Sequence, residues 1–120
     1  LSVATVTAWV PADGSLLVRL VRNLVDNALR HARRAVRVVV TCEGAEALVR
    51  VWNDGPPIPD DDLERIFQPF TRLDEARASD DGGAGLGLSI ARQVAEVHGG
   101  SLVAEPCTDG ASFVARLPLA

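Results

Sequence analysis

Apolar positions along the chain follow two different periods, and these periods predict the order of helices and strands. In residues 15–32 the apolar side chains recur at helical spacing, and Asp13 is the candidate N-cap of this helix. Residues 87–98 repeat the helical pattern and end at Gly99-Gly100, a pair typical of a helix C-terminus. The sequence therefore predicts two amphipathic helices.

Each predicted helix has a distinct buried face. In the first helix the apolar side chains gather on one side, at Leu17, Leu20, Val21, Leu24, Ala28 and Ala32. The opposite side is polar and carries Arg19, Asn23, Asp26, Asn27 and Arg30. In the second helix three aliphatic side chains are expected to point inward, namely Ile90, Val94 and Val97.

Alternating or β-branched runs predict the strands, at residues 3–10, 35–42, 47–53, 101–105 and 111–117. Turn sequences separate the second strand from the third and the fourth from the fifth. The order β-α-β-β-α-β-β predicts an α+β fold, a two-layer α/β sandwich. We expect a mixed, mostly antiparallel sheet of about five strands, covered on one face by about three helices.

Two further segments lie between the strands and the second helix. Residues 60–67 are expected to form a short helix capped by Asp60 or Asp61. Residues 71–85 are charged and then glycine-rich, which is typical of a long mobile loop such as a functional lid.

Composition restricts the classes of function. The 120 residues suit a single domain spanning 1–120, and the net charge of -4 argues against a nucleic-acid surface. No apolar run reaches the length of a membrane span, so no direct membrane contact is expected. Cys42 and Cys107 could form one disulfide, but two buried free thiols in a reduced compartment are favoured.

The basic residues exclude two ways of binding a nucleotide. All 12 are arginine, and the sequence contains no lysine. A Walker A loop needs a lysine on the phosphates, and protein Ser/Thr/Tyr kinases need a lysine on a strand. Both classes are therefore excluded.

Three polar or glycine-rich stretches are candidates for a binding site. Asn23 and Asn27 are spaced i, i+4, so they share a helix face that could hold a hydrated metal and phosphates. Residues 53–59 (NDGPPIP) follow a strand and could present a polar side chain to a pocket. Residues 82–89 (GGAGLGLS) open a helix, where backbone N–H groups can approach phosphate. Alone, each stretch also fits a solvated face, an ordinary turn or a flexible linker.

Together, the stretches resemble the ATP-binding domain of sensor histidine kinases, a branch of the superfamily that includes gyrase B subunits and MutL. LVRNLVDNALRHA at 20–32 resembles the N box, VWNDGPPIP at 51–59 the G1 box, and IFQPFTR at 66–72 the F box. Residues 82–100 resemble the G2 box with its helix, and GASF at 110–113 resembles the last glycine box. The resemblance covers nearly the whole chain.

The resemblance implies a role for each matching residue. It assigns Mg²⁺ to Asn27, catalytic positions near the phosphates to Asn23 and Arg30, and phosphate or ribose to His31. It assigns the adenine pocket to Asn53, Gly55, Ile58 and Ser112. It assigns the lid and its phosphate contacts to Phe67, Phe70, Arg72, Gly83, Gly85, Leu86, Gly87 and Leu88.

Two positions depart from the family pattern. Asn53 replaces the aspartate that normally binds the adenine amino group, and Pro57 replaces the second glycine of that box. An amide oxygen at Asn53 can still accept a hydrogen bond from that amino group, although the negative charge is lost. Both changes bear on nucleotide affinity more than on nucleotide identity.

The resemblance also favours a kinase over a hydrolase. Superfamily members that hydrolyse ATP carry a general-base glutamate at the position of Asn23, and an amide cannot take up a proton at neutral pH. Neither His31 nor His98 is expected to accept phosphate. The acceptor histidine is expected on a separate dimerisation domain of the same protein, so the isolated chain should be a monomer that cannot label itself.

The expected partners are this dimerisation domain and a response regulator, in a cytoplasmic setting with any membrane anchor outside the chain. Two alternatives stay open at this point. One is an anti-sigma-factor serine kinase of the same superfamily, and the other is a nucleotide-sensing or docking module without transfer activity.

Overall fold

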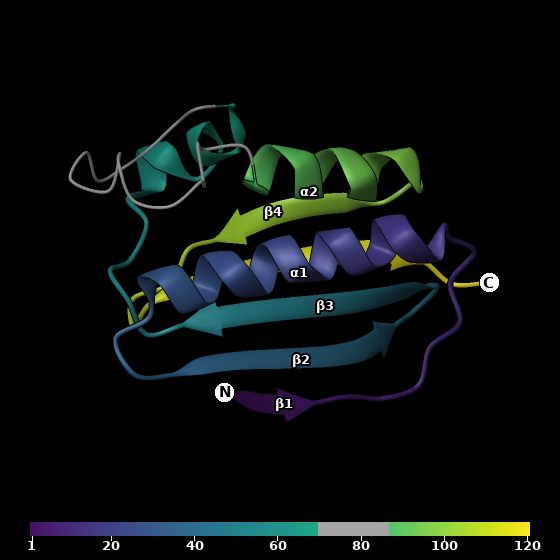
Figure 1. The fold of residues 1–120 in the computed structure, drawn as a ribbon, viewed down its shortest axis with the longest axis horizontal. Coiled ribbons are helices and arrows are strands. Elements are labelled where there is room, and N and C mark those ends of the chain that lie inside the picture. Colours follow the sequence, from purple (N-terminus) through teal and green to yellow (C-terminus); the bar gives the residue numbers. More distant parts are fainter. Residues whose placement is uncertain (70–86) are drawn as a thin grey trace.

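The computed structural model describes residues 1–69 and 87–120. They form a five-stranded sheet with two α-helices lying side by side over one face (Figure 1). The strands and α-helices are β1 (Ser2–Ala4), α1 (Gly14–His31), β2 (Val36–Glu43), β3 (Glu46–Asn53), α2 (Gly87–Val97), β4 (Ser101–Glu105) and β5 (Ala111–Pro118). Two 3-10 helices, η1 (Asp60–Asp62) and η2 (Arg65–Phe67), lie between β3 and α2.

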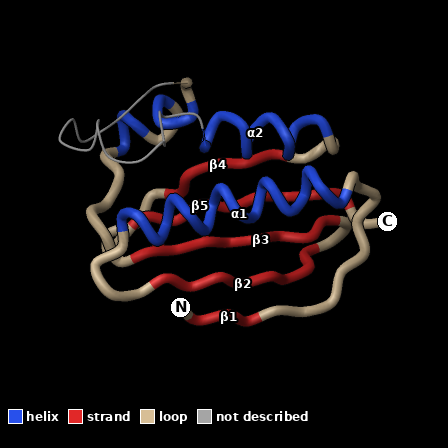
Figure 2. Tube along the Cα trace, viewed as in Figure 1, coloured by secondary structure: helices blue, strands red, loops and turns tan. Residues whose placement is uncertain are grey.

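The sheet is mixed, with strand order β1-β2-β3-β5-β4 (Figure 2). β1 pairs with β2 in parallel, and every other pair is antiparallel. In the central pair, β3 lies against β5 with Asn53 opposite Ala111 and Trp52 opposite Ser112. The predicted α+β two-layer sandwich is confirmed.

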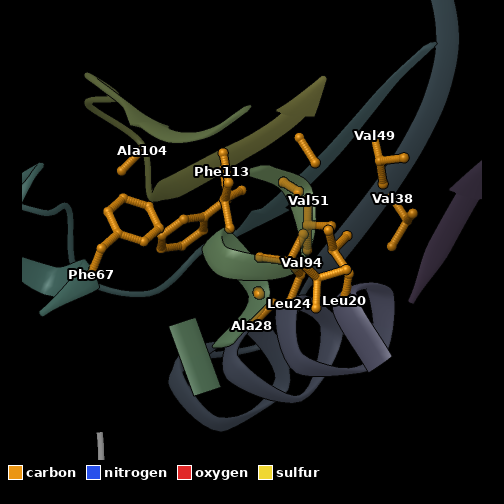
Figure 3. Packing of buried hydrophobic residues seen from close by; sticks show 14 of the residues in the cluster. Leu20, Leu24, Ala28, Val38, Val49, Val51, Phe67, Val94, Ala104 and Phe113 are labelled. Carbon is orange, nitrogen blue, oxygen red and sulfur yellow. The ribbon is translucent and has the colours of Figure 1, made fainter. Parts of the chain in front are cut away.

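The apolar face of α1 supplies a large part of the core. Leu20, Leu24 and Ala28 are fully buried, as the helical spacing predicts. They pack in one cluster with Val51 of β3 and Phe113 of β5 (Figure 3). Burying one leucine side chain contributes about 1.5–3 kcal/mol, so this face is a principal source of stability.

The predicted N-cap of α1 and the glycine pair that ends α2 are confirmed. The Asp13 carboxylate accepts hydrogen bonds from the backbone N–H groups of Ser15 (2.9 Å) and Leu16 (3.3 Å), as an N-cap does. At the end of α2, Gly99 has φ +80°, and the N–H of Gly100 donates to the carbonyl of Ala95 (2.8 Å). This geometry is the C-terminal motif that favours glycine.

His98 joins the beginning of α1 to the end of α2. Its Nε2 atom accepts from the backbone N–H of Asp13 (3.1 Å), and its Nδ1 atom lies 2.8 Å from the carbonyl oxygen of Val94. His98 therefore has a structural role, because its ring joins the two helices.

Several local predictions were wrong. Val97 is 71% exposed, because the buried stripe of α2 runs through the small residues Ala91 and Ala95, which allow close packing. Residues 60–67 form η1 and η2 rather than one helix, and the N-cap of η1 is Pro59, which makes no side-chain capping bond. The predicted strand 3–10 is reduced to β1 (Ser2–Ala4), which starts one residue earlier. Beyond β1, the Val6 N–H still donates to the Val40 carbonyl of β2.

Both cysteines are free, but Cys42 is exposed and Cys107 half-buried rather than both being buried. Neither α-helix in the described ranges combines the length and apolar character that crossing a bilayer requires.

Candidate functional site

The predicted site lies where three elements converge at one end of the molecule. α1 ends, β3 ends and α2 begins at this end, the left side of Figure 1. The Nδ2 atom of Asn23 donates to the carbonyl oxygen of Gly87, the first residue of α2, over 3.2 Å. The amide-bearing helix and the start of the glycine-preceded helix, which are 64 residues apart in sequence, are therefore in direct contact.

Asn27 lies one turn beyond Asn23 on the same face of α1, and both are half-buried. The Asn27 side chain forms no hydrogen bond within residues 1–69 and 87–120. Its amide oxygen is therefore available to coordinate a cation. Arg30 and His31 follow in the last turn of α1 and are exposed. Basic side chains in this position add positive potential beside the two amides.

Asn53 is the buried polar residue at the end of β3. It is 1% exposed, and its Oδ1 atom accepts a hydrogen bond from the backbone N–H of Gly55 over 2.8 Å. This bond identifies which amide atom is oxygen, since a nitrogen there would face another donor. The Nδ2 atom is buried and has no hydrogen-bond partner within the described ranges. The residue opposite it in the sheet, Ala111, offers no polar side-chain atom.

Gly55 lies where β3 turns away beneath the end of α1. A Cβ atom at this position would overlap the backbone carbonyl oxygen of His31 and crowd Oδ1 of Asn53. Only glycine permits this close approach, so the turn depends on Gly55. Ile58 and Leu88, two other predicted contacts, are half-buried against the core cluster.

The expectation for Ser112 needs correction. Successive side chains of a strand point to opposite faces, and Ser112 lies on the open face, away from Asn53. Its hydroxyl donates to Oε1 of Glu105 (3.1 Å), which also forms an ion pair with Arg50 (3.1 Å). Together with Trp52 they line a hollow of 290 Å³ on that face. The β5 residue that shares the face of Asn53 is Ala111.

Asp54 has a structural task that sequence reasoning missed. Its carboxylate accepts hydrogen bonds from the backbone N–H groups of Arg33 (2.8 Å), Arg34 (3.0 Å) and Ala35 (3.1 Å). These bonds, first that from Arg34, hold the pKa of the Asp54 carboxyl below its ordinary value. Asp54 therefore fixes the connection from α1 to β2 and does not replace the aspartate missing at position 53.

Acidification is expected to destabilise the fold partly through Asp54. Because the folded-state pKa is lowered, this contribution is present above the unfolded pKa of about 4 and is lost as the pH falls through the folded pKa. Urea unfolding of the wild type and of Asp54→Asn at pH 6 and pH 3 measures it. The variant should lose less stability on acidification than the wild type does.

The control for this prediction is Asp61→Asn, an exposed aspartate of η1. This variant should lose as much stability between pH 6 and pH 3 as the wild type. The interpretation of Asp54 is contradicted if Asp54→Asn and Asp61→Asn respond to acid equally.

Phe67 anchors the segment that precedes residue 70. It is buried and meets Phe113 edge to face, with ring centroids 6.2 Å apart (Figure 3). The guanidinium of Arg92 on α2 lies 4.4 Å from the centroid of the Phe67 ring and also pairs with Glu64 over 2.9 Å. Phe67 belongs to η2 and is held there by its contact with Arg92 of α2, in keeping with the predicted anchoring position. The predicted contacts Phe70, Arg72, Gly83, Gly85 and Leu86, and the loop 71–85, lie outside the described residues.

Comparison with known proteins places these features in a family. Residues 12–120 match the model of the histidine kinase-, DNA gyrase B-, and HSP90-like ATPases. The sensor protein CutS of Streptomyces coelicolor is 42% identical over 115 residues, which cover 93% of this chain and 28% of CutS. The sensor protein RstB of Escherichia coli is 38% identical over 108 residues, covering 89% of this chain and 25% of RstB. The chain thus spans about a quarter of the length of these relatives.

Solved structures show the same fold. The mycobacterial sensor histidine kinase MprB superimposes with a TM-score of 0.81 at 30% identity, covering 98% of this chain and 80% of that one. The catalytic domain of histidine kinase ThkA gives 0.78 at 32% identity, covering 98% and 78%. Full-length ShkA in complex with AMPPNP gives 0.83 at 25% identity, covering 99% of this chain and 26% of ShkA.

Proposed function

The chain belongs to the histidine kinase-, DNA gyrase B-, and HSP90-like ATPase family, and from this premise we propose that it is the Mg-ATP-binding catalytic domain of a sensor histidine kinase. In the longer protein it would donate the γ-phosphate of ATP to a histidine on a dimerisation domain. A response regulator would then receive the phosphoryl group. The names of the relatives, which are sensor proteins and histidine kinases, support this reading.

The observation that carries the proposal is the contact of Asn23 with Gly87. It brings the polar stripe of α1 against the N-terminus of α2, where backbone N–H groups and the helix dipole favour a phosphate anion. Asn27, one turn away, supplies a neutral oxygen of the kind that Mg²⁺ accepts beside phosphate oxygens and water. Arg30 and His31 lie within the same stretch of α1 and can balance phosphate charge.

The described residues also fit a nucleotide base. The buried Nδ2 atom of Asn53 lacks a partner, which is the condition expected of a group whose partner is a ligand. When bound, Mg²⁺ would neutralise charge on the phosphates during transfer, and the residues of the chain would contribute positioning. Catalytic roles are proposed for Asn23 and Arg30, and a positioning role for Asn27 through the metal.

Isothermal titration calorimetry with ATP tests the proposal. The chain should bind ATP in the presence of MgCl₂, and affinity should fall when EDTA replaces the metal. Absence of heat and of competition by a fluorescent ATP analogue would leave the docking-module alternative as the better account. In the longer protein, γ-labelled ATP should label a histidine outside residues 1–120, whereas an acid-stable phosphoserine on a partner would favour the anti-sigma-factor alternative.

We expect the isolated chain to hydrolyse ATP negligibly. Asn23 cannot act as a general base, and its Nδ2 atom is engaged as a donor to the Gly87 carbonyl. Phosphate release over several hours, followed with excess Mg-ATP, measures this, and turnover like that of a gyrase would contradict the prediction. Asn23→Glu introduces a possible base but sets a carboxylate against that carbonyl, so any gain in hydrolysis should come with weaker ATP binding.

A further inference from the structure

Asn53 holds a hydrogen-bond donor that no residue of the described chain uses. Its side chain is 1% exposed, and Nδ2 is the one buried side-chain polar atom in the described ranges that has no hydrogen-bond partner. Leaving such a donor unpaired disfavours the ligand-free state, so an acceptor brought to it by a ligand gains affinity.

The orientation of the amide is fixed by the backbone. Because Gly55 N–H donates to Oδ1 over 2.8 Å, turning the amide over would put two donors against each other. Gly55 is itself held close beneath the His31 carbonyl, where no larger residue fits. Thus Nδ2 presents N–H groups, and Oδ1 keeps one lone pair for a second partner.

No neighbouring strand residue satisfies the donor. Ala111 lies directly opposite Asn53 and on the same face of the sheet, and its methyl group cannot accept a hydrogen bond. The hydroxyl of Ser112 points to the other face and donates to Glu105. In the structure Nδ2 is shielded from solvent, so a base reaches it only after neighbouring side chains shift.

We propose that Asn53 binds the base by donating from Nδ2 to the N1 atom of adenine, while Oδ1 accepts from the 6-amino group. This inference rests on the proposed function. Adenine presents an acceptor at N1 beside a donor at the 6-amino group, which matches an amide on both atoms. Guanine approaching in the same way would place N1–H against Nδ2 and its 6-oxo group against Oδ1, which gives two mismatches. The amide therefore recognises adenine through one donor and one acceptor, whereas a carboxylate could only accept hydrogen bonds.

The test compares ATP with 1-deaza-ATP, in which a C–H replaces N1, by calorimetry on the wild-type chain with Mg²⁺. Binding of 1-deaza-ATP buries Nδ2 without an acceptor, so it should be weaker than ATP by about 5- to 100-fold. Equal affinity for the two nucleotides overturns the inference but leaves the proposed function intact. Failure of the chain to bind either nucleotide would instead count against the proposed function.

Asn53→Asp provides the second arm. A carboxylate keeps the acceptor for Gly55 N–H and for the 6-amino group but has no donor for N1, so the variant should fold and still bind ATP. Its affinities for ATP and 1-deaza-ATP should differ by less than about twofold, since no donor remains to be left unpaired. If Asn53→Asp discriminates between the two nucleotides as strongly as the wild type, Nδ2 does not contact N1 and the inference is wrong.

Discussion

Asn27→Ala is expected to weaken Mg-ATP binding by about 100-fold or more, a loss at least as large as that seen when residues supporting a metal are removed. The proposed metal site takes one protein oxygen from this amide, and alanine offers none. Calorimetry with and without MgCl₂ measures the effect. The wild type should bind more tightly when the metal is present, whereas the variant should bind ATP with similar weakness in both conditions.

The fold should survive this change, because Asn27 lies on the polar face of α1 and alanine is the better helix former. Gln93→Ala is the matched control: it removes an exposed amide from the other helix, away from the proposed metal site. This control should bind Mg-ATP like the wild type. An Asn27→Ala variant that kept its dependence on magnesium would exclude Asn27 as the ligand.

Gly55→Ala is expected to lower the free energy of unfolding by about 2–3 kcal/mol, at the upper end of what overpacking costs. The added methyl group would meet a backbone carbonyl, that of His31, and Oδ1 of Asn53. Backbone cannot give way as the end of a side chain can, so the end of β3 must move away from α1. Urea unfolding followed by circular dichroism measures the loss, and ATP affinity should fall with it because Asn53 is displaced.

Gly14→Ala is the control for this prediction. It adds the same methyl group at the first residue of α1, where nothing lies within 4 Å of the added atom. We expect no loss of stability there, and a gain of up to about 1 kcal/mol from reduced freedom of the unfolded chain. Equal stability of the two alanine variants would show that the approach of Gly55 to α1 is not as tight as described.

Periodicity was sufficient to predict the elements that the core depends on. Leu20, Leu24 and Ala28 recur at helical spacing, and burial of that stripe needs no information beyond the sequence. The contact between Asn23 and Gly87 is long-range, and only the family resemblance predicted that these two segments would meet. The resemblance predicted that the two segments meet, and the structure shows that the contact is a hydrogen bond from Asn23 Nδ2 to the Gly87 carbonyl oxygen.

The roles of Ser112 and Asp54 could not be predicted from the sequence, because they depend on strand register and on tertiary contacts. Ser112 was expected near the base, but Ala111 is the residue opposite Asn53, and a shift of one residue along a strand puts a side chain on the other face of the sheet. The task of Asp54 depends on three consecutive N–H groups that turn toward it only when β3 lies against the end of α1. No local pattern encodes such a tertiary arrangement.

Hydrogen bonds hold helix α2 to α1 and its N-cap residue at both ends. Near its start the Gly87 carbonyl receives a bond from Asn23, and just beyond its end the His98 ring receives one from the N–H of Asp13. The second bond lies at the other end of the molecule from the proposed triphosphate site (Figure 1). A nucleotide that competed for the Asn23 amide would therefore remove only the hydrogen bond at the start of α2, while the middle of the helix stays held by the burial of Ala91, Val94 and Ala95.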